Sequence, residues 1–220
     1  MTDVEAMQYS PLSLELARIL GEDYATRPFT LNEVLEKTEG RGVFLVIILL
    51  CLPFVAPVSI SGMSTPLGIA IAVLAARHAL HKPPRIPRWL GDRDLSPKMK
   101  KIILGGGMKV LRIVEKAVRP RRTFWMSWPA ARIINSLAVA YAAFLLALPL
   151  PPIPPFTNMF PGYAIILLAA SMMEEDGLLI WAGYAATLGT TIYFVVCARM
   201  IATHFTKWFH GLMHLLHLST

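Results

Sequence analysis

Arginine is the residue type through which this sequence could most readily do chemistry, and that chemistry is the binding of anions. Arg119, Arg121 and Arg122 stand close together, and Arg85 and Arg88 lie in a second basic stretch. A guanidinium group recognises a phosphate through two parallel hydrogen bonds. We therefore expect these five arginines to bind an anionic group, such as the headgroup of a lipid.

Two groups of acidic residues have an ordinary structural interpretation beside a functional one. Glu115 lies four residues before Arg119, so the two could form a surface ion pair of small energy. Glu174, Glu175 and Asp176 stand between two apolar segments. Acids at membrane depth usually serve a function, for example as a proton or cation site. Because three adjacent acids point in different directions on a helix, a solvated turn is the preferred interpretation.

Four histidines, His204, His210, His214 and His217, lie near the end of the sequence. The last three would share a helix face, and two histidines four residues apart can bind zinc. Zinc proteases of this pattern have glutamate directly after the first histidine, whereas this chain has Gly211. We expect an amphipathic tail, no metal and no cofactor. Since no catalytic triad, redox cysteine pair or nucleotide-binding motif is recognisable, we also expect no enzymatic activity.

The elements that must position these residues are dominated by apolar sequence. Hydrophobic residues make up 55% of the 220 positions and charged residues 16%, whereas a soluble domain usually has about a quarter charged residues. The uncharged stretches are 43–60, 67–76, 133–149 and 178–198. Because a helix needs about 20 apolar residues to span a bilayer, only the last two approach that length. This composition predicts an all-α, polytopic integral membrane protein.

A proline-broken apolar pattern occurs twice in the chain. Each copy has an apolar arm, a tip containing proline and small polar residues, and a second apolar arm. The tip residues are Pro53, Pro57, Ser61, Ser64, Thr65 and Pro66 in the first copy and Pro149, Thr157, Asn158 and Pro161 in the second. Paired interruptions of this kind are typical of transporters with inverted repeats, whose site lies where the helices break. We expect two helical hairpins, either re-entrant or fully spanning, with a cavity at their tips.

Charge is distributed unevenly and predicts how the chain is organised. Residues 77–132 hold fifteen of the 21 lysines and arginines, which places this region in the cytoplasm by the positive-inside rule. The expected units are N-terminal cytoplasmic amphipathic helices (1–42), a first hairpin (43–80), a basic strap with interfacial helices (81–132), a second hairpin (133–176), a final membrane span (177–200) and the tail (201–220). Nucleic acid is disfavoured as a partner because no soluble domain carries the basic charge.

Several short motifs, taken in order over roughly residues 10–200, carry a family resemblance. They are Arg41-Gly42, the prolines of the first hairpin with its Ser64-Thr65-Pro66-Leu67-Gly68 stretch, Pro87-Arg88-Trp89-Leu90, Glu115 with Arg119-Pro120-Arg121, and Asp176-Gly177. Together they resemble the ExoD family of bacterial membrane proteins. The resemblance implies the bacterial inner membrane and a process, exopolysaccharide synthesis, but no reaction. The hairpin layout is also similar, at the level of fold, to DedA-type lipid transporters.

The sequence is compatible with two functions from different classes. In the first, the protein binds or translocates a lipid or lipid-linked anionic intermediate, with the headgroup at the arginines and the chain between the hairpins. In the second, it is a non-catalytic scaffold or regulator that contacts polysaccharide-synthesis proteins. An interfacial hydrolase is a third class, but no catalytic pair supports it. Small residues in the last span would also allow a homodimer.

Overall fold

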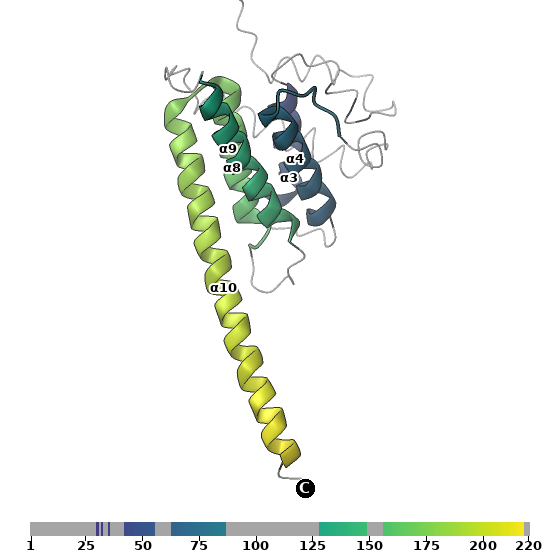
Figure 1. Ribbon diagram of the computed structural model, residues 1–220, viewed down its shortest axis with the longest axis vertical. Helices are drawn as coiled ribbons and strands as arrows, with labels where there is room; N and C mark the ends of the chain where they lie inside the picture. Colours follow the sequence, from purple (N-terminus) through teal and green to yellow (C-terminus); the bar gives the residue numbers. More distant parts are fainter. Residues whose placement is uncertain are drawn as a thin grey trace, which may run out of the picture.

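Five helices make up the part of the chain that the computed structural model describes, which comprises residues 30, 32, 35, 42–55, 63–86, 128–148 and 156–217. In chain order they are α3 (Gly42–Val55), α4 (Ser64–Ala79), α8 (Pro129–Ala147), α9 (Met159–Glu174) and α10 (Gly177–His217) (Figure 1). The expected all-α fold is therefore confirmed over these residues.

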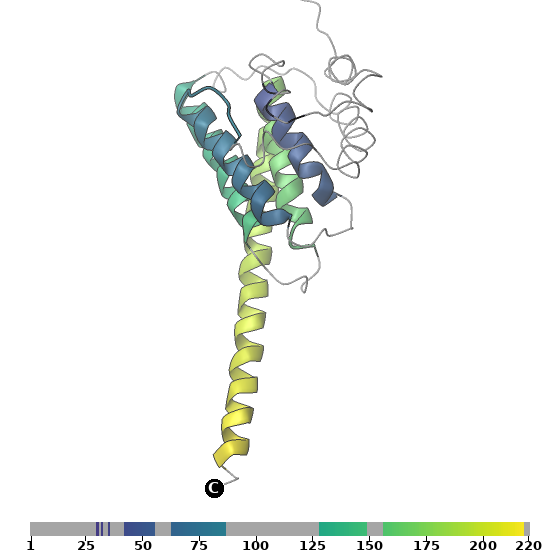
Figure 2. The same cartoon turned by 90° about the vertical axis from the view of Figure 1, so that its right-hand side faces the viewer.

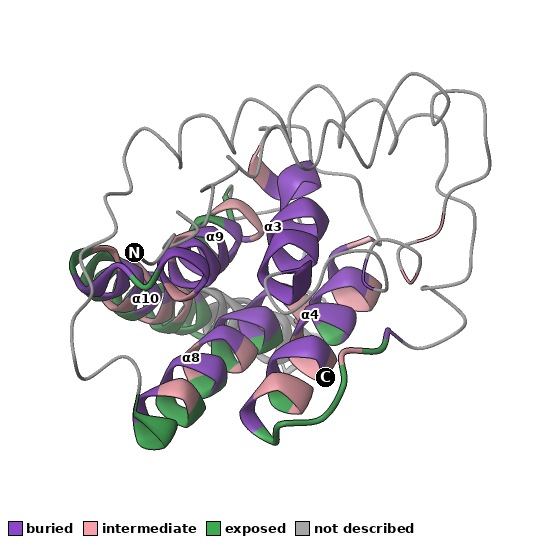
Figure 3. Cartoon of the chain, turned by 90° about the horizontal axis from the view of Figure 1, so that it is seen from above, coloured by how far each residue is buried: buried purple, intermediate pink, exposed green. Residues whose placement is uncertain are grey.

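The inner helices of the bundle are α3 and α9. Every residue of α3 from Gly42 to Phe54 is buried, and so are most residues of α9 (Figure 3). A helix that is apolar on all sides is expected in the interior. With 14 and 16 residues, these helices are about 21 and 24 Å long. Both are shorter than the hydrocarbon core of about 30 Å that a membrane span must cross.

Within the described part of the chain, the outer helices α8 and α10 are the ones long and apolar enough to cross a membrane, over Pro129–Ala147 and Gly177–Met200. Only 22% of the most apolar α10 window is buried, whereas the core helix of a soluble protein would be mostly covered. Their exposed side chains are large and apolar and include Ile134, Leu137, Phe144, Leu188, Ile192 and Val196. These helices support a membrane protein, and the larger number of crossings stays a prediction.

Each helix of the first hairpin packs mainly against one helix of the second hairpin. Helix α4 packs mainly on α8, and α3 packs mainly on α9 (Figure 2). Gly68, near the start of α4, lies against the backbone of Ala143 and Ala147 near the end of α8. Gly162, near the start of α9, lies against Phe54 near the end of α3. Both contacting pairs are therefore antiparallel, and both hairpin tips lie at the same end of the bundle.

This common direction corrects the inverted arrangement that we expected from the sequence. Helices α3 and α8 both run toward the tip end, and α4 and α9 both return from it (Figure 1). The pairs α3–α4 and α8–α9 therefore run in the same direction, and an internal repeat stays a prediction. The sequence pattern could not distinguish the two cases because a broken hairpin has the same apolar profile in either orientation.

The prolines near the hairpin tips occupy different positions in their helices. Pro53 lies inside α3, two residues before its end at Val55. From the sequence we expected Pro53 to break the helix, and α3 instead passes through Pro53 and ends two residues later at Val55. Because proline lacks a backbone N–H and its ring crowds the carbonyl four residues earlier, it disturbs the turn before it and not the residues that follow. Pro66 and Pro161 lie in the first turns of α4 and α9, where proline is tolerated.

The last helix is much longer than the others. Helix α10 runs for 41 residues without a break from Gly177 to His217, which gives it a length of about 62 Å. It therefore continues through the boundary expected at residue 200 and extends past the rest of the bundle (Figure 2). Gly183 lets α9 approach closely, since a Cβ there would lie 2.6 Å from Leu168 Cδ2.

Candidate functional site

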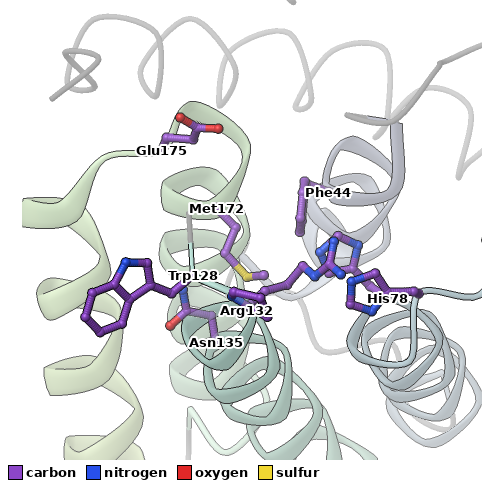
Figure 4. A pocket seen from close by; sticks show the side chains of 9 residues that line it. Phe44, His78, Trp128, Arg132, Asn135, Met172 and Glu175 are labelled. Atoms are coloured by element: carbon purple, nitrogen blue, oxygen red, sulfur yellow. The ribbon is translucent and has the colours of Figure 1, made fainter. Parts of the chain in front are cut away.

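A cavity of about 490 Å³ lies at the end of the bundle opposite to the hairpin tips. It is formed where α4 and α9 end and where α8 begins. Its lining residues are Phe44, His78, His81, Trp128, Pro129, Arg132, Asn135, Met172 and Glu175 (Figure 4). The lining is thus partly apolar, with several hydrogen-bonding groups and an excess of groups that can carry positive charge.

The C-terminus of α4 turns sharply to bring His81 to the cavity. His81 has a left-handed backbone with φ of 56°. The His81 amide donates to the carbonyl of His78 over 3.2 Å, and the Lys82 amide donates to the carbonyl of Arg77 over 2.9 Å. These two bonds form a Schellman cap, which usually has glycine in the left-handed position. A histidine there carries a modest backbone strain.

The C-terminus of α9 makes a similar turn at Glu175, which has φ of 52°. The Asp176 amide donates to the carbonyl of Ser171 over 3.0 Å. Asp176 Oδ1 then accepts the amides of Leu178 and Leu179, at 2.9 and 3.3 Å, and so caps α10. The turn expected at these acids is confirmed, but it is not fully solvated, because Asp176 and the preceding Glu174 are buried and Glu175 alone of the three is exposed.

Arg132 is the central basic residue of the site. It lies in the first turn of α8, and its side chain reaches toward α4, where His78 lies (Figure 4). The Arg132 Nε atom is buried and has no hydrogen-bond partner among the residues that the structure describes. His78 is half-buried, and its ring meets that of Phe44 edge-on at 4.8 Å. Burial, followed by the charges of Arg132 and His81, lowers the pKa of His78 below its ordinary value.

Asn135 connects the cavity to α10. It is one turn after Arg132 on the same side of α8, and only 2% of its surface is exposed. Its Oδ1 atom accepts a hydrogen bond from the hydroxyl of Tyr184 on α10. A second bond between the same helices joins the hydroxyls of Tyr141 and Thr191 at 3.2 Å, farther from the cavity.

The arginines predicted from the sequence are not those that the cavity contains. Arg85 is exposed on the segment that follows α4 and does not line the cavity. Arg88, Arg119, Arg121 and Arg122 lie outside the described residues, as does Glu115, so their anion-binding role and the expected ion pair stay predictions.

The predicted tip residues also lie away from the cavity. Ser64, Thr157 and Pro161 are buried at the opposite end of the bundle, while Thr65, Pro66 and Asn158 are partly buried there. Pro57, Ser61 and Pro149 fall outside the described residues, and so do the side chains of the four C-terminal histidines. The location of a site at the tips therefore stays a prediction.

Four residues of the cavity were not predicted from the sequence, namely Arg132, His78, His81 and Asn135. Arg132 was counted with the basic stretch, although it directly precedes an uncharged apolar run. A usable signal existed, since a polar residue within an apolar helix usually has a function, and Asn135 follows Arg132 by three positions. No comparable signal identifies His78, because its role depends on the packing of α4 against α8.

Anion binding is the chemistry that this arrangement supports. Arginine and histidine side chains donate hydrogen bonds and can carry positive charge, and the start of α8 adds the positive end of a helix dipole. Among the residues that the structure describes, no cluster of three or more His, Cys, Asp or Glu side chains is suited to a metal ion.

Comparisons with known proteins give a family and two informative relatives. A family model described as "Exopolysaccharide synthesis, ExoD" matches residues 12–196. The chain is 34% identical over 167 residues to "Protein ExoD" of Rhizobium meliloti (strain 1021), covering 76% of this chain and 69% of that protein. It is 25% identical over 192 residues to an uncharacterized protein of Synechocystis sp., covering 84% and 87% of the two chains. No solved structure matches significantly.

Proposed function

Because the chain belongs to the ExoD family, whose description is exopolysaccharide synthesis, we propose that it supports this process by binding an anionic lipid or lipid-linked intermediate. In this proposal, the anionic headgroup enters the cavity at the start of α8. The hydrocarbon part remains among the apolar surfaces of the outer helices.

The observation that carries the proposal is the buried Nε atom of Arg132, for which the described part of the chain supplies no hydrogen-bond partner. Leaving a buried donor unpaired costs free energy, and the cost is larger for a charged group. An anion in the cavity would remove this cost and would also meet His78 and His81. The site is thus better suited to the bound state than to the empty one.

The surrounding surface fits a lipid better than a soluble anion. Trp128 lines the cavity and is 53% exposed, and tryptophan is favoured at the level of lipid headgroups. Large apolar side chains are exposed along the remaining length of α8 and α10. Since His78, His81 and Arg132 belong to the basic region 77–132, we place the cavity on the cytoplasmic side of the bacterial inner membrane.

Binding is a better supported activity than translocation. The α4–α8 contact is closed near the tips, because Gly68 lies directly against the backbone of Ala143 and Ala147. The α3–α9 contact is less tight, since a Cβ at Gly162 would lie 3.3 Å from the Cβ of Phe54. A hydrocarbon chain could therefore pass between the hairpins only if these helices separated.

The test is a titration of the full chain, held in nanodiscs of zwitterionic lipid, with a short-chain anionic lipid. Loss of one charge-assisted hydrogen bond should weaken binding by roughly tenfold or more, so Arg132→Gln should do so. Arg199→Gln is the matched control, because Arg199 is exposed on α10 and does not line the cavity. Wild-type protein that binds no anionic lipid would refute the proposal.

A scaffold or regulator of polysaccharide-synthesis proteins is the alternative function. It is favoured by the length of α10, which runs for 41 residues and whose C-terminal part extends past the bundle, where a partner could lie against it. This alternative predicts that a synthesis protein co-purifies with the full chain and that the complex survives Arg132→Gln. Headgroup binding predicts instead that the biological role is lost with Arg132.

A further inference from the structure

The amide of Asn135 is the least expected polar group in the cavity. It is almost fully buried on α8, where a leucine or alanine would cost nothing in desolvation. A carboxamide has one acceptor oxygen and an NH₂ group with two hydrogens to donate. The oxygen already accepts the hydroxyl of Tyr184. This bond fixes the orientation of the carboxamide and leaves the amide nitrogen as its remaining hydrogen-bonding group.

The donors of the cavity then lie on two opposing walls. Arg132 and Asn135 are on α8, one turn apart. His78 and His81 are at the end of α4, toward which Arg132 reaches (Figure 4). An arginine can engage two oxygens of one anion at once. A donor one turn away and an imidazole opposite would reach further oxygens of the same group.

We propose that the cavity is a site for a phosphate monoester, with Arg132, His78 and the NH₂ group of Asn135 as donors and with Tyr184 as a positioning residue. A monoester has three terminal oxygens and a charge between about −1.5 and −2 at neutral pH. A phosphodiester has only two such oxygens and a single charge, so it leaves one wall of donors unpaired. This inference rests on the proposed headgroup binding and names the class of headgroup.

Tyr184 acts on the ligand only through Asn135. By donating to Oδ1, its hydroxyl holds the carboxamide so that the nitrogen is the atom left for the ligand. The Tyr141–Thr191 bond joins the same two helices, but neither residue lines the cavity. Variants of the two tyrosines can therefore distinguish an effect on ligand binding from an effect on the packing of α8 against α10.

The experiment compares three probes with the full chain in zwitterionic nanodiscs. Short-chain phosphatidate is a monoester lipid, short-chain phosphatidylglycerol is a diester lipid, and inorganic phosphate lacks the lipid. We expect phosphatidate to bind at least about tenfold more tightly than phosphatidylglycerol, the difference that one charged hydrogen bond would give. If inorganic phosphate binds as tightly as phosphatidate, the phosphate site is supported and its ligand is soluble.

Variants then test the assigned roles. Asn135→Asp keeps an acceptor for Tyr184 but replaces the NH₂ group with an oxygen, so it should abolish the preference for phosphatidate. Tyr184→Phe should weaken phosphatidate binding about threefold to tenfold through loss of orientation. Tyr141→Phe should leave binding unchanged, although it removes a bond between the same helices.

Three results would overturn the inference while leaving anionic headgroup binding intact. They are equal affinity for the two lipids, an unchanged preference in Asn135→Asp, and equal losses in Tyr184→Phe and Tyr141→Phe. The last result would mean that both tyrosines only hold α8 against α10. Absence of binding to every anionic probe would instead refute the proposed function itself.

Discussion

The two ends of the helical bundle solve different packing problems. At the tip end, glycines bring helices into direct backbone contact, as Gly68 does against α8. At the cavity end, α4 and α9 stop in left-handed turns, and the space beyond them holds basic and amide side chains. We infer that the closed end stabilises the fold, while the cavity end is less stable because it forms a binding site.

The largest effect should come from breaking the closed end with Gly68→Ala. The added Cβ would lie 2.8 Å from the carbonyl oxygen of Ala143 and 2.8 Å from the amide nitrogen of Ala147. These are backbone atoms, so α4 and α8 would have to separate, at a cost of about 1–3 kcal/mol. Thermal unfolding of the full chain in detergent, followed by circular dichroism, would measure the loss.

The control for this change is Gly189→Ala on α10. A Cβ at Gly189 would have no atom within 4 Å, and alanine favours a helix over glycine by up to about 1 kcal/mol. Gly189→Ala should therefore be neutral or stabilising. Equal destabilisation by the two variants would mean that the close contact at Gly68 does not hold the bundle together.

At the open end, Arg132→Met should have opposite effects on stability and binding. Methionine keeps much of the apolar length of arginine but removes the buried Nε atom that lacks a partner. The ligand-free protein should gain about 1 kcal/mol of unfolding free energy, and its affinity for an anionic lipid should fall. Unfolding and lipid titration on the same preparation would check both signs. A variant that loses stability without ligand would show that Arg132 has a structural role.

A smaller gain should follow from His81→Gly. His81 holds a left-handed backbone in the cap of α4, and glycine adopts this conformation without steric strain. Glycine is also more flexible in the unfolded chain, and this reduces the gain. The net increase in the free energy of unfolding should be about 0.5 kcal/mol. Thermal unfolding compared with His81→Ala separates the two contributions, because alanine keeps the strain. A Gly variant no more stable than the Ala variant would contradict this account.

The smallest effect should be a pH dependence that comes from His78. Its neighbours are Phe44 on α3, Arg132 on α8 and His81 at the end of its own helix. Burial and then the two basic neighbours lower the pKa of His78 in the folded protein. Below pH of about 6.5 the unfolded chain therefore binds a proton that the folded chain resists, so stability falls as the pH falls.

This pH dependence can be measured by comparing wild-type protein with His78→Gln. The wild-type unfolding temperature should fall more steeply between neutral and acidic pH than that of the variant. Parallel curves would show that the environment of His78 contributes nothing to stability. Addition of an anionic lipid should reduce the slope, because a negative charge beside His78 favours its protonated form.

Local features of the chain were predictable where they depend on nearby residues. The apolar runs 133–149 and 178–198 correspond to α8 and to the first part of α10, since a long apolar helix is set by composition alone. The turn at Glu175 and the cap at Asp176 also follow from short-range chemistry. The end of α3 lies two residues after Pro53, because the missing N–H and the ring of a proline act on the turn that precedes it.

The site itself was predictable only in its chemistry. The sequence indicated arginine and an anion, but it indicated the arginines of the basic strap. Arg132 could have been recognised as a charge at the edge of an apolar run. Its position close to His78 could not have been predicted, because the two residues are 54 positions apart in the chain. They come together only through the packing of α4 on α8.

By itself, the sequence determined that the chain is helical and rich in apolar residues, and it carried the ordered motifs of the ExoD family. These properties depend on residue type and local spacing. Tertiary structure decided that the two helix pairs run in the same direction, that α4 packs closely on α8 at Gly68, and that the cavity lies at the other end of the bundle. These properties depend on which helices touch, and backbone contacts at glycine and buried polar bonds between distant residues settle that choice only in the folded chain.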